Sequence, residues 1–188
     1  MKMRVLLATL LLVASATTAM AAGPYVGASA GFSVFHDSDV TVPGFGSGEI
    51  SYDLGAGLNV VAGYDAGDFR GEAEFGYKTA DVEDDTTEAT VTSYMLNGYY
   101  DFKGNAAVTP FVGLGIGLIN GELEDGGDEV DDTVLGYQFS VGAAIKVASN
   151  VDLDLSYRYQ SIIDDFTVSG VDISYGSSNL MAGVRLKF

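Results

Sequence analysis

Apolar residues alternate with small or polar residues along eight segments of the chain, and this period of two limits the possible folds more than any other feature. The last segment shows it clearly, because its apolar positions are Leu180, Ala182, Val184, Leu186 and Phe188. Successive side chains of a β-strand point to opposite faces, so the pattern predicts strands with one apolar and one mostly polar face. The other seven segments are residues 26–34, 53–64, 69–78, 94–102, 106–119, 137–147 and 151–160.

Residues 106–119 are apolar enough to resemble a membrane helix. Within them, however, Gly113, Gly115 and Gly117 recur at every second position. Glycine at that spacing would weaken a helix, and a period of two is the signal of a strand. We therefore predict a strand here as well.

The two faces of these strands differ in a way that is not expected in a soluble β-protein. The face opposite the apolar one consists mostly of glycine, serine, asparagine and charged residues. It is too small and polar to form the dry core of a secreted soluble barrel or sandwich, the alternative fold for alternating strands. A membrane barrel turns its apolar side chains toward lipid and its polar side chains toward the lumen.

The connections between the segments alternate in length. Short ones lie at residues 65–68, 103–107 and 148–150, and long ones lie at residues 36–51, 79–91, 120–132 and 161–174. Short periplasmic turns and longer extracellular loops are typical of outer-membrane barrels. The sequence thus predicts an all-β fold, an eight-stranded antiparallel up-and-down transmembrane β-barrel in the bacterial outer membrane.

The first 21 residues have the pattern of a secretory signal peptide. Lys2 and Arg4 precede a short apolar run, and Ala19 and Ala21 supply the small residues of a cleavage site. The apolar run, roughly ten residues, is too short for a spanning helix, which needs about twenty. We expect residues 22–188 to form the barrel domain, with both termini on the periplasmic side because the number of strands is even.

The charge balance and the absence of cysteine narrow the possible functions. The chain has 26 acidic and nine basic residues, for a net charge of −17. A nucleic-acid partner is not expected, because phosphate binding needs a basic surface. A chain without cysteine forms no disulfide and carries no lipoprotein anchor or thiol chemistry.

Several short motifs resemble the membrane domain of the OmpA family. Residues 25–37 are similar to its first strand, residues 54–57 with Gly63 and Tyr64 to its second, and residues 74–77 to its third. Residues 97–102 resemble the wider family of small porin-like surface proteins, and the chain is also similar to OmpX-type barrels, which are bare barrels with protruding loops.

The resemblance has limits and implications. OmpA continues into a periplasmic peptidoglycan-binding domain, whereas this sequence stops at Phe188, so wall tethering is not implied. The resemblance does imply that the apolar C-terminal set, from Leu180 to Phe188, is the signal that the barrel-assembly machinery reads.

Charged residues on the inward faces are expected to converge in the lumen. An eight-stranded barrel is only wide enough for side chains to fill it, and buried charges need partners. We predict that Glu74 pairs with Arg158, or alternatively with Lys146 or Arg185, and the resemblance places Glu74 at the position of a glutamate in a comparable OmpA network. A sealed structural network and a narrow gated ion path both fit these residues. The predicted lumen charge network is Arg70, Glu72, Glu74, Lys78, Lys146, Arg158 and Arg185.

The sequence predicts no catalytic residue, no cofactor and no metal site. The one histidine, His36, stands beside Asp37 and Ser38, but adjacency does not place a base within hydrogen-bond reach of a nucleophile. The acidic runs at 81–88 and 122–132 could bind a divalent cation, yet they lack the order of an EF-hand loop. Solvated loop tips are the favoured interpretation.

We expect a structural or surface-interaction role through acidic extracellular loops, since loops on a rigid scaffold carry such functions. The alternatives are a narrow gated ion channel and, less favoured, a lipid-modifying barrel enzyme. The expected partners are outer-membrane lipid and lipopolysaccharide, the barrel-assembly machinery, and a surface ligand or host factor. The barrel itself is expected to be a monomer.

Overall fold

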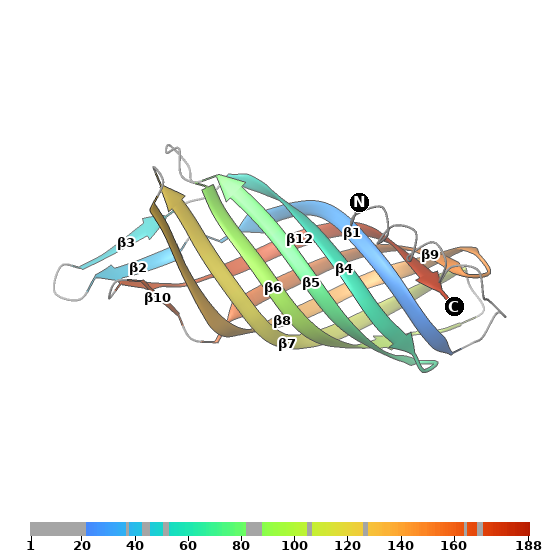
Figure 1. Cartoon of the computed structure of the whole chain (residues 1–188). Coiled ribbons are helices and arrows are strands. Elements are labelled where there is room, and N and C mark those ends of the chain that lie inside the picture. The colour runs from blue at the N-terminus through green and yellow to red at the C-terminus, as the bar shows by residue number, and fades with distance from the viewer. Residues whose placement is uncertain are drawn as a thin grey trace, which may run out of the picture.

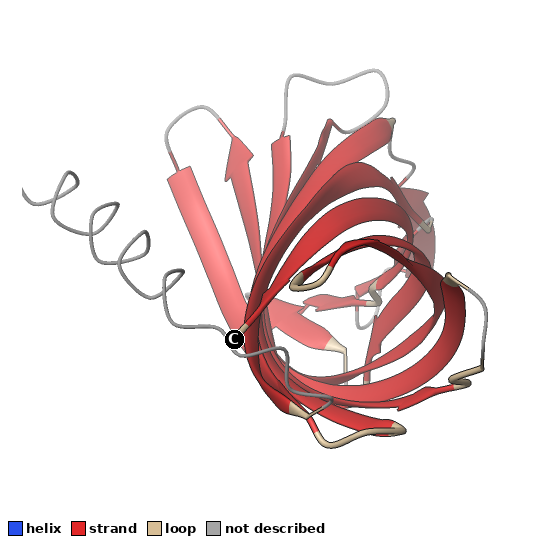
Figure 2. Cartoon of the chain, turned by 90° about the vertical axis from the view of Figure 1, so that its right-hand side faces the viewer, coloured by secondary structure: helices blue, strands red, loops and turns tan. Residues whose placement is uncertain are grey.

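The chain forms a closed antiparallel barrel of eight strands. The computed structural model describes residues 22–36, 38–42, 46–50, 53–81, 88–104, 107–125, 128–163, 165–168 and 171–188, so the expected signal peptide lies outside the described residues. The barrel strands are β1 (Gly23–Phe35), β4 (Leu54–Asp65), β5 (Phe69–Asp81), β6 (Glu88–Asp101), β7 (Val108–Asp125), β8 (Asp128–Ala148), β9 (Val151–Ile162) and β12 (Gly176–Lys187). The predicted fold class is confirmed, and Figure 2 shows the ring of strands from one end.

The first and last barrel strands close the ring. Tyr25 pairs with Lys187 and Phe32 pairs with Leu180, while the other edge of β1 pairs with β4. The amide of Phe188 donates to the carbonyl of Pro24 at 3.0 Å, which extends the ladder to the last residue. Every barrel strand therefore has a neighbour on both sides, as a bilayer without water to satisfy open edges requires. No helix in the described ranges is long and apolar enough to span a membrane.

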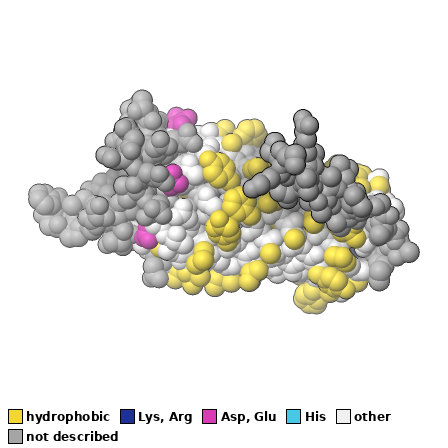
Figure 3. All heavy atoms as spheres, in the orientation of Figure 1, with side chains coloured by type: hydrophobic (Ala, Val, Ile, Leu, Met, Phe, Trp, Pro, Cys, Tyr) yellow, Lys and Arg dark blue, Asp and Glu magenta, His cyan; other side chains and the backbone are white. Residues whose placement is uncertain are grey.

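The two faces of the wall are those that the alternation predicts. Leu114 on β7 is 70% exposed on the outer surface, whereas Met95 on β6 is 1% exposed and Gln160 on β9 is fully buried inside the barrel. On the side of the molecule drawn in Figure 3, hydrophobic side chains spread over the barrel wall. The barrel thus has an apolar exterior and a polar interior, the reverse of a soluble β-sandwich.

The two ends of the barrel differ, and we name them by their connections. The turn end carries the short connections and the C-terminus. In its β4–β5 turn, Gly67 has a φ of 101°, a left-handed conformation that favours glycine, and its amide donates to the Asp65 carboxylate at 2.9 Å. The loop end carries the long connections, and β2 and β3 project from it in Figure 1.

The long connections contain more strand than the sequence led us to expect. Residues 36–51 include β2 (Ser38–Val42) and β3 (Gly46–Ile50), and residues 161–174 include β10 (Phe166–Val168) and β11 (Val171–Ile173). These strands form a second sheet in the order β10-β11-β2-β3, which we call the loop-end sheet. The prediction of plain loops was wrong here because two hairpins far apart in the sequence pair with each other, through Ile173 and Val40, and single segments do not reveal this.

The connection at residues 120–132 was also predicted wrongly as a loop. β7 and β8 continue their ladder through Leu123 and Val130 to a final pair between Asp125 and Asp128. Acidic residues have low β-propensity, but pairing between two long neighbouring strands overrides a weak local preference. This hairpin therefore extends the barrel wall beyond β9, whose pairing with β8 ends at Gly136 and Ile162. On its other side, β6 pairs with β7 as far as Glu88 and Glu124.

The position of Leu114 allows a test of which face meets lipid. Replacing Leu114 with arginine should lower the free energy of unfolding in lipid vesicles by about 2–4 kcal/mol, because the side chain lies near the middle of the apolar wall. Val147, which is 54% exposed close to the turn end, is the control position. Val147→Arg should cost about 0–1 kcal/mol. Equal costs in denaturant titrations would contradict a lipid-facing wall centred on Leu114.

Candidate functional site: the filled lumen

The side chains inside the barrel form three layers, and the first lies near the turn end. Arg70 on β5 is at its centre, with Nε 2.7 Å from Oδ2 of Asp101 and Nη1 2.8 Å from Oε1 of Glu72. The hydroxyl of Tyr25 donates to the same Glu72 oxygen at 2.6 Å. The Arg70 guanidinium also lies 4.4 Å from the ring centroid of Tyr99, within the range of a cation–π contact. All of these groups are buried, so each charge has an opposite charge and hydrogen bonds to offset its desolvation.

A second arginine occupies the same layer on the other wall. Nε of Arg185 on β12 lies 2.6 Å from Oδ2 of Asp154, and its Nη2 lies 3.9 Å from Oδ2 of Asp152. Lys187 binds Asp152 at 2.8 Å closer to the opening. These contacts join β12 to β9, next to the β1–β12 ladder that closes the barrel.

The middle layer is built on Glu74. Its carboxylate forms an ion pair with Arg158 from β9. It also accepts hydrogen bonds from the side-chain amides of Gln138, at 3.3 Å, and Asn97, at 3.4 Å. The side chain of Gln138 bonds to Asn97 in turn, at 3.2 Å. Four strands thus meet at one carboxylate, and a polar network connects the walls of the barrel.

Lys78 lies at the limit of the polar layers toward the loop end. Its side chain is 3% exposed, and Nζ donates to Oε1 of Gln160 at 2.5 Å. The hydroxyl of Tyr175 donates to the same oxygen at 3.1 Å. No carboxylate of the described residues forms an ion pair with Lys78. This buried cation is therefore held differently from the three arginines.

The third layer is apolar and fills the lumen toward the loop end. Phe166, carried by β10 of the loop-end sheet, enters this layer and lies 6.3 Å from Tyr175 between ring centroids, and Tyr175 lies 5.7 Å from Phe35. A Cβ atom at Gly121 would stand 3.0 Å from the Phe166 ring, so glycine allows the ring to approach the wall. The cluster comprises Phe35, Ala80, Ala89, Val91, Met95, Ile119, Ile162, Phe166 and Tyr175. We call it the apolar plug.

The structure places six of the seven predicted lumen residues inside the barrel and one outside it. Arg70, Glu72, Glu74, Lys78 and Arg185 are buried. Arg158 is part-buried in its ion pair with Glu74.

Lys146 is exposed, and its predicted lumen position was wrong. It lies on the inward side of the alternation, but it is next to the end of β8, where a register shift between Lys146 and Ala148 breaks the ladder. The last buried inward position on that strand is Ala144, so Lys146 is already at the opening. A residue can thus have the correct parity for the lumen and still lie beyond it.

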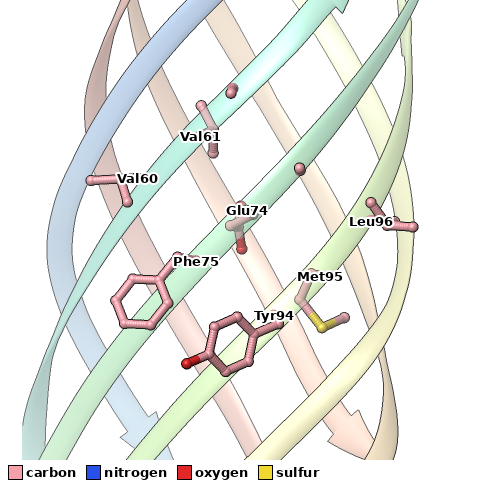
Figure 4. A pocket seen from close by; sticks show the side chains of 9 residues that line it. Val60, Val61, Glu74, Phe75, Tyr94, Met95 and Leu96 are labelled. Atoms are coloured by element: carbon pink, nitrogen blue, oxygen red, sulfur yellow. The ribbon is translucent and has the colours of Figure 1, made fainter. Parts of the chain in front are cut away.

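A small cavity lies among the described charged side chains of the lumen. It has a volume of about 20 Å³ and lies between Glu72, Arg158 and Arg185, room for about one water molecule. A larger apolar groove of about 490 Å³ lies on the wall of β4, β5 and β6. Figure 4 shows its lining side chains, among them Val60, Phe75, Tyr94 and Leu96, spread over three neighbouring strands. Its outward-facing lining makes this groove part of the surface that meets lipid acyl chains.

The residues considered for metal or catalytic chemistry are only partly described. Of the acidic runs, the side chains of residues 82–88 and 123–131 lie outside the described residues. Among those that are described, no group of three or more histidine or acidic side chains is placed to hold a metal ion. The imidazole of His36 lies 2.9 Å from the hydroxyl of Ser178 on β12, a residue that sequence adjacency did not suggest.

The barrel architecture agrees with the comparisons with known proteins. A model of the outer membrane protein β-barrel domain matches residues 5–188. This chain belongs to that family. It is an outer-membrane β-barrel protein, as the alternation of its strands predicted.

Two curated relatives match about half of the chain. It is 29% identical to outer membrane protein PagN of Salmonella typhimurium over 122 residues, and this match covers 54% of this chain and 51% of PagN. It is 30% identical to a Rickettsia conorii protein named "Putative adhesin RC1281" over 118 residues, and this match covers 51% of this chain and 47% of the relative. The matched region is therefore about half the length of either relative.

Solved structures match over nearly the whole chain. Neisserial surface protein A is 28% identical with a TM-score of 0.68, covering 89% of this chain and 99% of its own. OprG of Pseudomonas aeruginosa has a TM-score of 0.60 at 15% identity, covering 88% of this chain and 97% of its own, and shows the fold alone.

The middle layer predicts a strong coupling between Glu74 and Arg158. Glu74→Gln or Arg158→Met alone should destabilise the barrel by about 3–5 kcal/mol, because each leaves a buried charge without its partner. The double variant should recover most of that loss in denaturant titrations of the protein in vesicles. The control is Lys78→Met, which removes a buried cation that has no carboxylate partner and should cost less than either single change. A double-mutant cycle without coupling would contradict the proposed network.

Proposed function

We propose that this protein recognises surfaces outside the cell, with the barrel as a rigid anchor and the loop-end sheet and acidic hairpins as the recognition surface. The observation that carries the proposal is the contrast between the two parts. Charged, polar and apolar layers of side chains occupy the lumen, while β2 and β3 form a separate sheet at the loop end and the β7–β8 hairpin extends beyond β9. One relative has the name of a putative adhesin, and this name supports the same function.

The lengths of the connections support the orientation that we propose for the barrel. Outer-membrane barrels have short periplasmic turns and long extracellular loops, so the loop end faces the medium and both barrel termini face the periplasm. This orientation places the loop-end sheet where it can meet a partner. It also places the C-terminal set from Leu180 to Phe188, on the edge that closes the barrel, where the barrel-assembly machinery would bind it before closure.

Charge limits the kind of partner. Residues 36–51, 79–91, 120–132 and 161–174 hold 18 of the 26 acidic residues and no lysine or arginine. The described acidic side chains on the side shown in Figure 3 lie toward the loop end. Complementary potentials accelerate and orient association. The partner we propose is accordingly a positively charged protein surface on another cell or in its matrix.

A narrow ion path is the other function that fits the sequence, and the packing of the lumen favours it less. An ion would have to separate the Glu74–Arg158 pair and then cross the apolar plug. Apart from the Tyr175 hydroxyl, the described side chains of the plug have no oxygen or nitrogen atom to replace the hydration shell of the ion. We propose no catalytic role, and the absence of enzymatic activity stays a prediction.

The hairpin formed by β2 and β3 gives the test of the proposed function. Residues 38–50 can be replaced by a short Gly-Ser turn, because β1 and β4 are neighbours at this point through Val34 and Leu54. Bacteria that display this variant should adhere to cultured epithelial monolayers no better than bacteria without the protein. Adhesion of the wild type should fall as salt is raised, because exposed charges are screened within roughly 10 Å at 0.1 M salt.

Two controls make the result decisive. Exchanging the turn at residues 148–150, at the opposite end, should leave adhesion unchanged. Because the chain has no cysteine, single cysteines can report orientation, and Asp128→Cys should react with an impermeant maleimide on intact cells while Asp68→Cys should not. Full adhesion without residues 38–50, in a barrel that is folded and correctly oriented, would refute this role for the hairpin.

A further inference from the structure

A group of polar and aromatic side chains interrupts the apolar outer wall at the loop end. His36 directly follows β1, Ser178 is on β12, Tyr157 and Tyr159 are on β9, and Tyr137 is on β8. All five have outward parity, on strands that are neighbours in the ring. We call this group the outer-rim cluster. Its side chains therefore lie on the outer side of the wall and point away from the lumen.

Hydrogen bonds join three of its members in a chain. The Tyr157 hydroxyl lies 2.9 Å from Oγ of Ser178, and Oγ lies 2.9 Å from Nε2 of His36. If the hydrogens run from Tyr157 through Ser178 to Nε2, the Nδ1 atom of His36 carries a hydrogen and is a donor. If they run in the opposite direction, Nδ1 is an acceptor. In either case, Nδ1 can form a hydrogen bond with a group other than Tyr157 and Ser178.

The hydroxyl of Tyr159 is a second polar atom that lies near the same position as Nδ1 of His36. A Cβ atom at Gly176 would stand 3.6 Å from Nδ1 of His36 and 3.6 Å from the hydroxyl of Tyr159, so both atoms face a position that has no side chain. The Tyr159 ring lies 5.6 Å from the His36 ring and 6.3 Å from the Tyr137 ring, with 49° between the planes in each pair. Inclined ring faces therefore flank two polar atoms that the described residues leave without hydrogen bonds.

We propose that the outer-rim cluster binds the saccharide headgroup of a glycolipid in the outer leaflet. A sugar hydroxyl both donates and accepts, so it suits His36 in either tautomer, and amphipathic aromatic rings suit a ligand that is apolar on its ring face and polar at its rim. A phosphate would accept only. No lysine or arginine in the long connections provides a charge for it, because the basic residues after Arg4 are in the lumen or at the turn end.

The depth of the cluster agrees with this ligand. His36 and Gly176 are at the boundary between the barrel wall and the loop-end connections, and aromatic rings at that level lie among headgroups. A lipid bound there would place its acyl chains along Phe32 and Leu180, which pair in the ladder just below and are 63% and 53% exposed. The proposal depends on the orientation proposed above, but not on the cationic partner of the loop-end sheet.

The test measures glycolipid binding to the refolded protein in detergent by native mass spectrometry. The probes are deep-rough lipopolysaccharide, the same lipid after enzymatic dephosphorylation, and phosphatidylglycerol. Gly176→Val fills the position between the two polar atoms, and His36→Phe removes Nδ1 while keeping an aromatic ring. Each should weaken binding of both lipopolysaccharide probes by roughly three- to tenfold, the value of one hydrogen bond, and should not change phosphatidylglycerol binding.

Tyr77→Phe provides the matched control. Tyr77 is 42% exposed, like Tyr137 and Tyr157, but it is on β5, on the far side of the ring from β12 and β9. Its variant should bind all three probes as the wild type does. Equal losses for Tyr77→Phe would show a general aromatic girdle and overturn the proposal. If the wild type and the two variants bound the dephosphorylated lipopolysaccharide equally well, the site would recognise phosphate, and this result would overturn the proposal as well. Unchanged binding of both lipopolysaccharide probes in folded Gly176→Val and His36→Phe proteins would also overturn it.

Discussion

The ladder between β1 and β12 is the contact on which the rest of the structure depends. In hydrocarbon, an unpaired backbone amide or carbonyl costs several kcal/mol, so a sheet with open edges cannot remain in a bilayer. Pairing from Tyr25 with Lys187 to Phe35 with Ser177 removes both edges together. The ion pairs of Arg185 with Asp154 and of Lys187 with Asp152 reinforce the neighbouring β12–β9 ladder from inside. Closure thereby fixes which side chains meet lipid and which meet each other in the lumen.

Closure with eight strands also determines where function can reside. A ring of this size has an interior that side chains fill. Here the filling is graded, from the Arg70 and Arg185 clusters through the Glu74 network to the apolar plug. Phe166 comes from the loop-end sheet, so the plug links the position of that sheet to the packing of the barrel. In the function that we propose, the wall and the lumen act as a scaffold, and the outer rim and the loop-end connections carry recognition.

The alternation of single segments predicted the architecture because each strand separates its faces residue by residue. The inward positions of Arg70, Glu72 and Glu74 follow from that parity alone. Parity does not report depth, and therefore it misplaced Lys146, which lies beside an irregularity at the end of β8. Nor does parity report how closely the lumen is packed: a Cβ atom at Gly113 would stand 2.3 Å from the ring of Tyr99. The contacts that the sequence missed join distant segments, such as Val40 with Ile173 and His36 with Ser178.

Conductance of the refolded protein in planar lipid bilayers tests the central claim, that the lumen is a sealed core, most directly. The account predicts no steady single-channel current for the wild type, because the Glu74–Arg158 pair and the apolar plug block the path in series. It predicts the same for Glu74→Gln in molecules that remain folded, because the plug is untouched. A stable conductance in the wild type that Glu74→Gln increases or lengthens would contradict it and would identify the lumen as a gated ion path.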